Sequence, residues 1–376
     1  MSERTVRGIE EVRGSVSSRL QSRTKSRTEP PVIDVDVHEA FASIRDLVPY
    51  LREPWRSRVA VADGGGGPPS FPYSYPQLSG VSKSEAVLGD GRPAGSDFAV
   101  MREQLLEAHN IEWAILAGGF YPTEMRTQTE FAGALAAAYN DWMIENWLAR
   151  DERLLGSVCV AAQDPQAAAR EIDRIGAHER VVQVMLPTIA HDVLGREFYH
   201  PLYEAAVRNG LVVAFHQGNT SGTAVGLPAY YIEWHTTMVQ SWQSQLVGLI
   251  SHGVFDRFPE LRVALIECGW TWVPSLMWRF DYNYRSVRRE VPWVKRLPSE
   301  YIREHVRATT QPMEFPEDPE DLYQMFEMIG SEEFLLFSTD YPHWDFDDPD
   351  RVFPASFPKE LRRKILYDNA RKFYRL

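Results

Sequence analysis

Eight short runs rich in β-branched residues alternate with longer amphipathic stretches along this chain of 376 residues. The first run lies within residues 32–41, and the other seven are 113–118, 155–162, 181–187, 211–216, 262–267, 306–311 and 333–339. This alternation favours parallel strands, because a parallel pair needs a crossover connection that is usually a helix. Eight repeats predict an α/β fold, a (β/α)8 TIM-type barrel. An open doubly wound sheet is the alternative, but no glycine-rich fingerprint follows the first run.

Two irregular segments interrupt this pattern. Residues 1–30 are rich in Arg and Ser and lack the apolar region of a secretory signal, so we interpret them as a flexible N-terminal arm. Residues 63–80 are rich in Gly, Pro, Ser and Tyr, which predicts a loop insertion of about 62–95 after the first strand. Such a loop either covers an active site or is plain surface disorder. The barrel itself is expected to span residues 31–376.

Composition excludes several classes of partner. The net charge of −12 argues against nucleic acid or an anionic membrane surface as a partner. The sequence contains no apolar run of 18 residues, so we expect no membrane span. The two cysteines, Cys159 and Cys268, are too few for a disulfide framework and are compatible with a reducing cytoplasm. A cytoplasmic protein with a small-molecule substrate is therefore expected.

The first strand carries an unusual charge. In "VIDVDVHEAF", residues 32–41, alternation places Asp34, Asp36 and His38 on one face. Burying a carboxylate costs several kcal/mol unless it is paired or bound to a metal. On this stretch alone, a metal or catalytic site and a solvated edge strand are equally acceptable explanations.

The other strands end in similar residues. Barrel enzymes place their chemistry at the carboxyl ends of the strands. The residues there are Asp36 and His38 at strand 1, His216 at strand 5, Glu267 at strand 6 and Asp340 after strand 8. Carboxylate and imidazole groups together suit one divalent metal, most simply Zn²⁺, with Mn²⁺ or Fe²⁺ as alternatives.

Four segments carry a family resemblance: "IDVDVHE", "AFHQGN", "GVFDRFPELRVALIECGWTWVPSLMWRFD" and "STDYPHWD". Together they resemble the amidohydrolase-related family, in the branch that includes aminocarboxymuconate-semialdehyde decarboxylase. The similarity extends from about Val32 to the C-terminus. It implies a distorted (β/α)8 barrel with a mononuclear metal bound by Asp36, His38, His216 and Asp340.

The sequence departs from the family pattern at two places. Many members have His-x-His on strand 1, where this chain has Asp36-x-His38. The family's catalytic histidine ends strand 6, where this chain has Glu267. His252 precedes strand 6 by about ten residues, so we place it at the opposite rim, capping a helix. Glu267 is therefore the first candidate for exchanging protons with the bound water.

Two further histidines are catalytic candidates. His343 follows Asp340 by three residues and is either a proton shuttle or a residue that packs under Trp344. His235 lies in the long segment after strand 5, from which it could reach the site. Asp34 is predicted not to be a ligand, because it lies one layer deeper on the strand and can be held by hydrogen bonds.

Three functions are compatible with these residues. The main hypothesis is a metal-dependent hydrolase that uses an activated water on a small aromatic or cyclic substrate, because a carboxylate such as Glu267 accepts a proton well. The alternative is a nonoxidative decarboxylase of an aromatic or unsaturated acid, and a non-catalytic barrel is the weakest hypothesis. An arginine near the metal would favour the decarboxylase, and the candidates are Arg45, Arg52, Arg56 and Arg126. Aromatic-rich loops are compatible with a homodimer.

Overall fold

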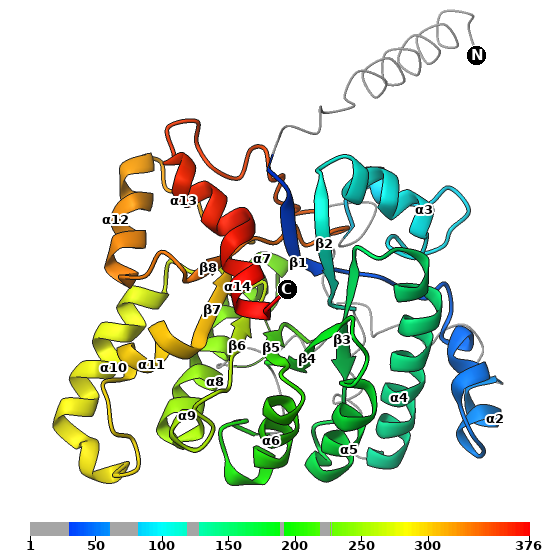
Figure 1. Ribbon diagram of the computed structural model, residues 1–376, viewed down its shortest axis with the longest axis horizontal. Coiled ribbons are helices and arrows are strands. Elements are labelled where there is room, and N and C mark those ends of the chain that lie inside the picture. Colours follow the sequence, from blue (N-terminus) through cyan, green and yellow to red (C-terminus); the bar gives the residue numbers. More distant parts are fainter. Residues whose placement is uncertain (1–29, 61–81, 119–127, 189–191, 219–225, 227) are drawn as a thin grey trace, which may run out of the picture.

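Eight parallel strands form one sheet in sequence order in the computed structural model (Figure 1). The structure describes residues 30–60, 82–118, 128–188, 192–218, 226 and 228–376. The strands are β1 (Val32–Val37), β2 (Ile111–Leu116), β3 (Leu154–Cys159), β4 (Val181–Pro187), β5 (Val212–His216), β6 (Val263–Leu265), β7 (Val306–Thr309) and β8 (Leu335–Leu336). This order confirms the predicted (β/α)8 barrel.

Backbone hydrogen bonds close the barrel between the last strand and the first. Val35 N donates to Phe337 O at 3.1 Å, and Asp340 N donates to Asp36 O at 3.1 Å. His38 N also donates to Tyr341 O at 2.7 Å. The closure runs past the end of β8, so it brings the chain around residue 340 alongside the end of β1.

Helices connect the strands and surround the sheet (Figure 1). The α-helices are α2 (Trp55–Ala60), α3 (Phe98–Met101), α4 (Thr129–Asn146), α5 (Pro165–Ile175), α6 (His200–Arg208), α7 (Tyr231–Thr237), α8 (Val239–Ser251), α9 (Val254–Arg257), α10 (Val273–Val287), α11 (Pro298–His305), α12 (Pro319–Ile329), α13 (Lys359–Arg363) and α14 (Asn369–Tyr374). The π-helical turn η8 (Lys364–Asp368) joins α13 to α14. Shorter 3-10 and π turns are η1 (Ile44–Tyr50), η2 (Ser84–Ala86), η3 (Arg102–Glu107), η5 (Leu148–Arg150), η6 (Glu197–Tyr199) and η7 (Arg288–Glu290). No helix among the described residues is both long and apolar enough to cross a membrane.

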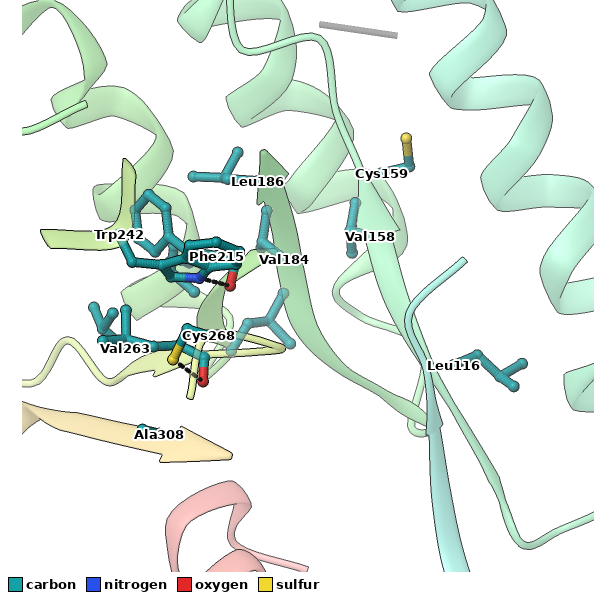
Figure 2. Close-up of a cluster of buried hydrophobic side chains, with 14 of the residues drawn as sticks. Leu116, Val158, Cys159, Val184, Leu186, Phe215, Trp242, Val263, Cys268 and Ala308 are labelled. Atoms are coloured by element: carbon teal, nitrogen blue, oxygen red, sulfur yellow. Dashed lines mark hydrogen bonds between the residues drawn. The ribbon is translucent and has the colours of Figure 1, made fainter. Parts of the chain in front are cut away.

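The main core lies between the strands and the helices that cover them. Figure 2 shows Trp242 of α8 against Phe215 of β5, and both side chains are fully buried. The indole Nε1 of Trp242 donates to Phe215 O at 3.1 Å, which satisfies a polar atom that would otherwise be buried without a partner. This contact fixes the end of β5 immediately before His216.

The first strand is buried on both faces. All six residues of β1 are buried, including Asp34 at 0 % exposure. The edge-strand alternative is therefore wrong, because the closure with β8 leaves β1 no free edge. The arm at residues 1–29 and most of the insertion, residues 61–81, lie outside the described residues. The described part of the insertion packs beside the β8 loop, where Lys83 N donates to Pro342 O at 2.8 Å.

Candidate metal centre and active site

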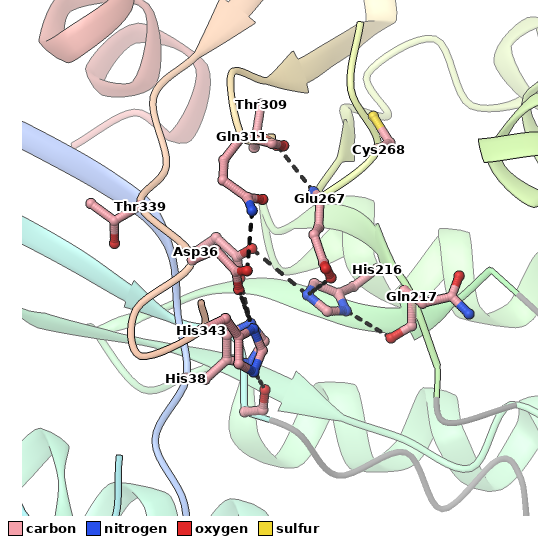
Figure 3. Close-up of polar contacts among 12 residues, drawn as sticks. Asp36, His38, His216, Gln217, Glu267, Cys268, Thr309, Gln311, Thr339 and His343 are labelled. Atoms are coloured by element: carbon pink, nitrogen blue, oxygen red, sulfur yellow. Dashed lines mark hydrogen bonds and ion pairs between the residues drawn. The ribbon is translucent and has the colours of Figure 1, made fainter. Parts of the chain in front are cut away.

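Four side chains meet at the carboxyl ends of the strands (Figure 3). Their potential ligand atoms all lie within 4.8 Å of one another, and all four residues are buried: Asp36, His38, His216 and Asp340. They come from the ends of β1 and β5 and from the segment after β8. The structure thus brings together the four residues that the sequence predicted as metal ligands.

Backbone carbonyls fix the orientation of both histidines. His38 Nδ1 donates to the carbonyl of Gly118, and His216 Nδ1 donates to Gln217 O at 2.8 Å. Each ring therefore directs Nε2 toward the carboxylates, which is the usual arrangement of histidines that bind metals. Gly118 has a positive φ of 64°, and a β-carbon there would collide with the hydroxyl of Tyr139. Glycine is thus required at the position that orients His38.

The acidic residues leave the site ready for a cation. Both carboxylate oxygens of Asp36 are buried and have no hydrogen-bond partner among the described residues. Asp340 Oδ1 lies 2.9 Å from His38 Nε2, and Asp36 Oδ2 lies 3.7 Å from His216 Nε2. Buried carboxylates without donors are costly unless a cation is bound. Two carboxylates and two imidazoles fit one divalent metal in charge and in ligand chemistry.

The charged residues of the site shift the pKa values of one another. Burial opposes the charge of His38, but Asp36 and Asp340 outweigh it and raise the pKa of His38 to about 10. Burial likewise opposes the charge of Asp340, yet His343 and His38 hold its pKa well below its ordinary value. The site therefore stabilises positive charge at the position where the four ligand atoms meet.

Glu267 stands beside this group, two residues past β6. Its Oε2 lies 3.1 Å from His216 Nε2, and the residue is 8 % exposed. Burial, together with Asp340, Asp345 and Asp36, raises the pKa of Glu267 well above its ordinary value. Its backbone has a φ of 55°, a strained conformation for a residue other than glycine. Such strain is typical of functional sites.

The two predicted catalytic histidines lie at this rim as well. His343 Nδ1 is 2.6 Å from Asp340 Oδ1, and its ring centroid is 4.4 Å from that of His38. His235 Nε2 is 3.5 Å from Asp345 Oδ2, and these two residues form a group with Glu267 within 4.8 Å. Both histidines are therefore close enough to exchange protons near the four-residue group.

Aromatic rings line the side of the site near His235. The His235 ring stacks on Tyr231 at a centroid distance of 5.3 Å, and the Trp344 ring lies 5.8 Å from that of His235 at an interplanar angle of 57°. Trp344 is 38 % exposed, so part of this surface is open to solvent. A flat, partly apolar surface beside charged groups is typical of sites for aromatic small molecules.

Asp34 is not part of the four-residue group, as predicted. Its carboxylate accepts hydrogen bonds from Thr339 N at 3.0 Å, Thr339 Oγ1 at 2.6 Å and Asp36 N at 3.2 Å. Burial nevertheless raises the pKa of Asp34 to about 7. His252, at the C-cap of α8 on the side where β6 begins, is also outside the site, as predicted.

Sequence reasoning missed one residue of this region, Gln311. Gln311, two residues past β7, is fully buried and donates from Nε2 to Asp340 Oδ2 at 3.1 Å. The same nitrogen donates to Asp345 Oδ2 at 3.0 Å. The rule that found the other site residues, chemistry at the carboxyl end of a strand, also applies to Gln311. An amide is a weak metal ligand, however, so Gln311 was not predicted as a site residue.

Three of the four arginines proposed as substrate partners lie in the described part of the chain. Arg45 lines a separate cavity of about 430 Å³ with Tyr50 and Trp142. Arg56 donates to Leu51 O at 2.9 Å, and Arg52 is exposed. Arg126 is outside the described residues. Within the described part of the chain, the ion pairs of the site carboxylates are all with histidines.

Comparison with known proteins finds similar curated proteins and similar solved structures. The chain is 26% identical over 301 residues to γ-resorcylate decarboxylase of Rhodococcus jostii, which covers 74% of this chain and 88% of the relative. A 5-carboxyvanillate decarboxylase from Novosphingobium aromaticivorans, complexed with manganese and a nitrobenzoic acid, matches with a TM-score of 0.69 at 20% identity, covering 94% of this chain and 98% of its own.

A dihydroxybenzoic acid decarboxylase from Polaromonas, with manganese and 2-nitroresorcinol bound, matches with a TM-score of 0.65 at 20% identity, covering 93% and 98%. These structural likenesses show the barrel fold. The family model described as amidohydrolase matches residues 33–376, nearly the whole barrel. The chain therefore belongs to the amidohydrolase family.

Proposed function

We propose that this protein is a metal-dependent, nonoxidative decarboxylase of a hydroxylated aromatic acid. The observation that carries the proposal is the buried group Asp36, His38, His216 and Asp340 in a chain whose curated relatives are γ-resorcylate decarboxylases. The hydrolase, our main hypothesis from the sequence, has less support, since these relatives cleave a carbon–carbon bond. The carboxy-lyase alternative replaces it.

The four-residue group would hold one divalent metal ion, which would act as a Lewis acid that binds and polarises the oxygens of the substrate. Manganese is the ion in two of the similar structures, so we propose Mn²⁺ ahead of the Zn²⁺ that the sequence suggested. Oxygen-rich ligand sets suit Mn²⁺. The carboxylates of Asp36 and Asp340 also balance the two charges of such an ion.

Decarboxylation requires one proton at the ring carbon. The bond between that carbon and the carboxylate breaks, its electron pair stays on the ring, and the products are CO2 and a phenol. Glu267 is the group placed to deliver the proton, because it is buried beside His216 and faces the ligand group (Figure 3). The sequence argument for hydrolysis treated Glu267 as a poor donor, but its acidic surroundings favour the protonated carboxylic acid.

The neighbouring residues have supporting roles in this proposal. The aromatic group formed by Tyr231, His235 and Trp344 would contact the ring of an aromatic substrate. His343 is partly exposed and contacts Asp340, so it is placed to pass protons between solvent and the site. His235 faces Glu267 and Asp345 and could return the proton that Glu267 gives up.

The test is decarboxylation by protein loaded with Mn²⁺. Purified protein is incubated with γ-resorcylate or 5-carboxyvanillate in D2O, and CO2 and the phenol are measured. We expect CO2 release with one deuterium at the carbon that lost the carboxylate. A His216→Ala variant is the control for contaminating activity. Hydrolysis of an amide or lactone by the same preparation, without any CO2 from either acid, would restore the hydrolase hypothesis.

A further inference from the structure

The last residue of β7 and the segment that follows it contact both of the strained residues of the site. Asp340 has a φ of 60° and Glu267 a φ of 55°, both in the left-handed region. These conformations are strained and persist only where the surroundings hold them. The two strands that pair with β7 are β6 and β8. Glu267, the proposed acid, follows β6, and Asp340, a proposed metal ligand, follows β8.

Thr309 holds the backbone of Glu267. The amide N of Glu267 donates to Thr309 Oγ1 at 3.1 Å, and the same hydroxyl donates to Gln311 O at 3.2 Å. Thr309 is fully buried, so water does not compete for these bonds. The hydroxyl thus fixes the peptide at which the chain turns into the left-handed conformation.

Gln311 holds the side chain of Asp340. Its Nε2 donates to Asp340 Oδ2 and to Asp345 Oδ2, so the two carboxylates share one amide group. The orientation of the amide is chemically determined, because an oxygen at that position would face two acidic oxygens. Asp340 Oδ1 remains on the side of His38 and His343. The amide therefore determines which oxygen of Asp340 faces the four-residue group.

We infer that Thr309 and Gln311 are positioning residues: Gln311 orients Asp340 for metal binding, and Thr309 holds Glu267 in place to deliver its proton. Both roles rest on the proposed function. The role of Gln311 requires only that the site binds a metal ion, and the role of Thr309 requires that Glu267 delivers the proton. Partners that orient metal ligands typically change affinity 10- to 100-fold when they are lost. Each residue acts through a different neighbour, so their effects should separate.

Two isosteric variants test this separation. Gln311→Met removes the amide and should raise the Mn²⁺ dissociation constant by roughly 10- to 100-fold in calorimetric titration of metal-free protein. Thr309→Val removes only the hydroxyl and should leave that constant within about twofold. It should instead speed hydrogen exchange at the Glu267 amide by roughly five- to tenfold, the effect of one lost buried hydrogen bond. Turnover should fall in both variants.

A matched control separates positioning from general loss of packing. Gln183 is also fully buried and makes two side-chain hydrogen bonds, to Ser157 Oγ at 2.7 Å and from the Tyr374 hydroxyl at 2.8 Å. Gln183→Met should lower the free energy of unfolding without weakening Mn²⁺ binding. An equal loss of affinity in this variant would show that destabilisation alone explains Gln311→Met.

The remaining outcomes are also decisive. Wild-type Mn²⁺ affinity in Gln311→Met, or unchanged exchange at the Glu267 amide in Thr309→Val, would overturn the corresponding role. If the wild-type protein bound no divalent metal, both this inference and the proposed function would fail. If it bound metal and responded as predicted but released no CO2 from any aromatic acid, only the proposed function would fail.

Discussion

Two buried polar groups lie at different levels of the barrel strands, and they differ in charge. The lower one is neutral: Tyr374 donates to Gln183, Gln183 donates to Ser157, and Ser157 donates to Leu116 O at 2.5 Å. The upper one is the four-residue group, with two carboxylates and two imidazoles. Gln183 pairs with the first residue of β5 and Pro187 with its last, His216, so the levels are separated by about 13 Å along β4.

Hydrogen bonding differs as well. In the lower group each polar side chain has a partner, which is the usual condition for stability in a core. In the upper group both oxygens of Asp36 have no hydrogen-bond partner among the described residues. Asp34 repeats this contrast within one strand, because its carboxylate accepts three hydrogen bonds. The complete hydrogen bonds of the lower group indicate a structural role, whereas the buried carboxylate of Asp36 requires a cation.

The largest expected effect comes from removing an upper imidazole. His216→Ala should abolish metal content, because the ligand group loses one of its two nitrogens. Elemental analysis after dialysis against Mn²⁺ measures this. His252→Ala is the control, since that side chain is exposed at the C-cap of α8. Equal metal stoichiometry in wild type and His216→Ala would refute the ligand assignment.

A smaller effect, on rate alone, is expected at Glu267. Glu267→Gln keeps the shape and hydrogen bonding of the side chain but cannot give or accept the proton. We expect full metal content and a decarboxylation rate lower by on the order of 10²-fold or more. Loss of metal together with rate would make Glu267 a ligand or a support for His216. If metal and turnover were both unchanged, His235 and His343 would become the leading candidates for proton transfer.

The effect of Asp34 should be on stability. Asp34→Asn leaves an amide nitrogen facing the donors of Thr339, so one or two buried hydrogen bonds are lost. We expect the free energy of unfolding to fall by roughly 1–3 kcal/mol in urea titrations, and the Mn²⁺ dissociation constant to stay within a few fold. If the free energy of Mn²⁺ binding fell by more than the free energy of unfolding, Asp34 would have a role in metal binding, as Asp36 does.

The smallest expected effect is on the pH dependence of the free energy of unfolding, and it comes from Asp347. Burial raises the pKa of Asp347 to about 7 from an ordinary 3.8, against the hydrogen bond from Met313 N and with help from Asp345 and Asp340. The folded protein therefore holds a proton that the unfolded chain releases. Stability from this group is complete below pH 3.8 and declines as pH rises to about 7, at no more than about 1.4 kcal/mol per pH unit.

Asp347→Asn should flatten this slope, because the amide does not titrate and its oxygen can still accept from Met313 N. Unfolding by urea at several pH values from 5 to 8 measures the difference between wild type and variant. The variant should gain relative stability as the pH rises through this range. Parallel curves would show that Asp347 is ionised in the folded protein throughout.

The sequence predicted the barrel and five residues at its carboxyl rim from local patterns, and the family resemblance implied which four of them form the metal group. Strand periodicity and the rule that barrel chemistry lies at carboxyl ends required no knowledge of contacts. The strand ends were less accurate: residues 262–267 and 333–339 were predicted, whereas β6 is Val263–Leu265 and β8 is Leu335–Leu336. Glu267, two residues past β6, and Asp340, four residues past β8, adopt the left-handed region, which these residue types do not signal.

Contacts across strands could not be predicted in the same way. Gln311 acts on a side chain 29 residues away, and its role depends on the distance of one amide from two carboxylates. The hydrolase hypothesis has less support than the carboxy-lyase alternative, and a physical reason explains the original preference. It assumed an ionised Glu267, whereas burial, together with Asp340, Asp345 and Asp36, raises the pKa of that residue in the folded barrel.

Barrel closure also sets the order of events during synthesis. Thr339 holds Asp34 across a separation of 305 residues, and the same closure brings Asp340 to Asp36. A ribosome adding 5–20 residues per second needs roughly 15–60 s to cover that interval. For that time the acidic first strand exists without its neighbour β8 and without a complete set of ligands. A metal ion can therefore stabilise the finished barrel, but it cannot guide the folding of the first half of the chain.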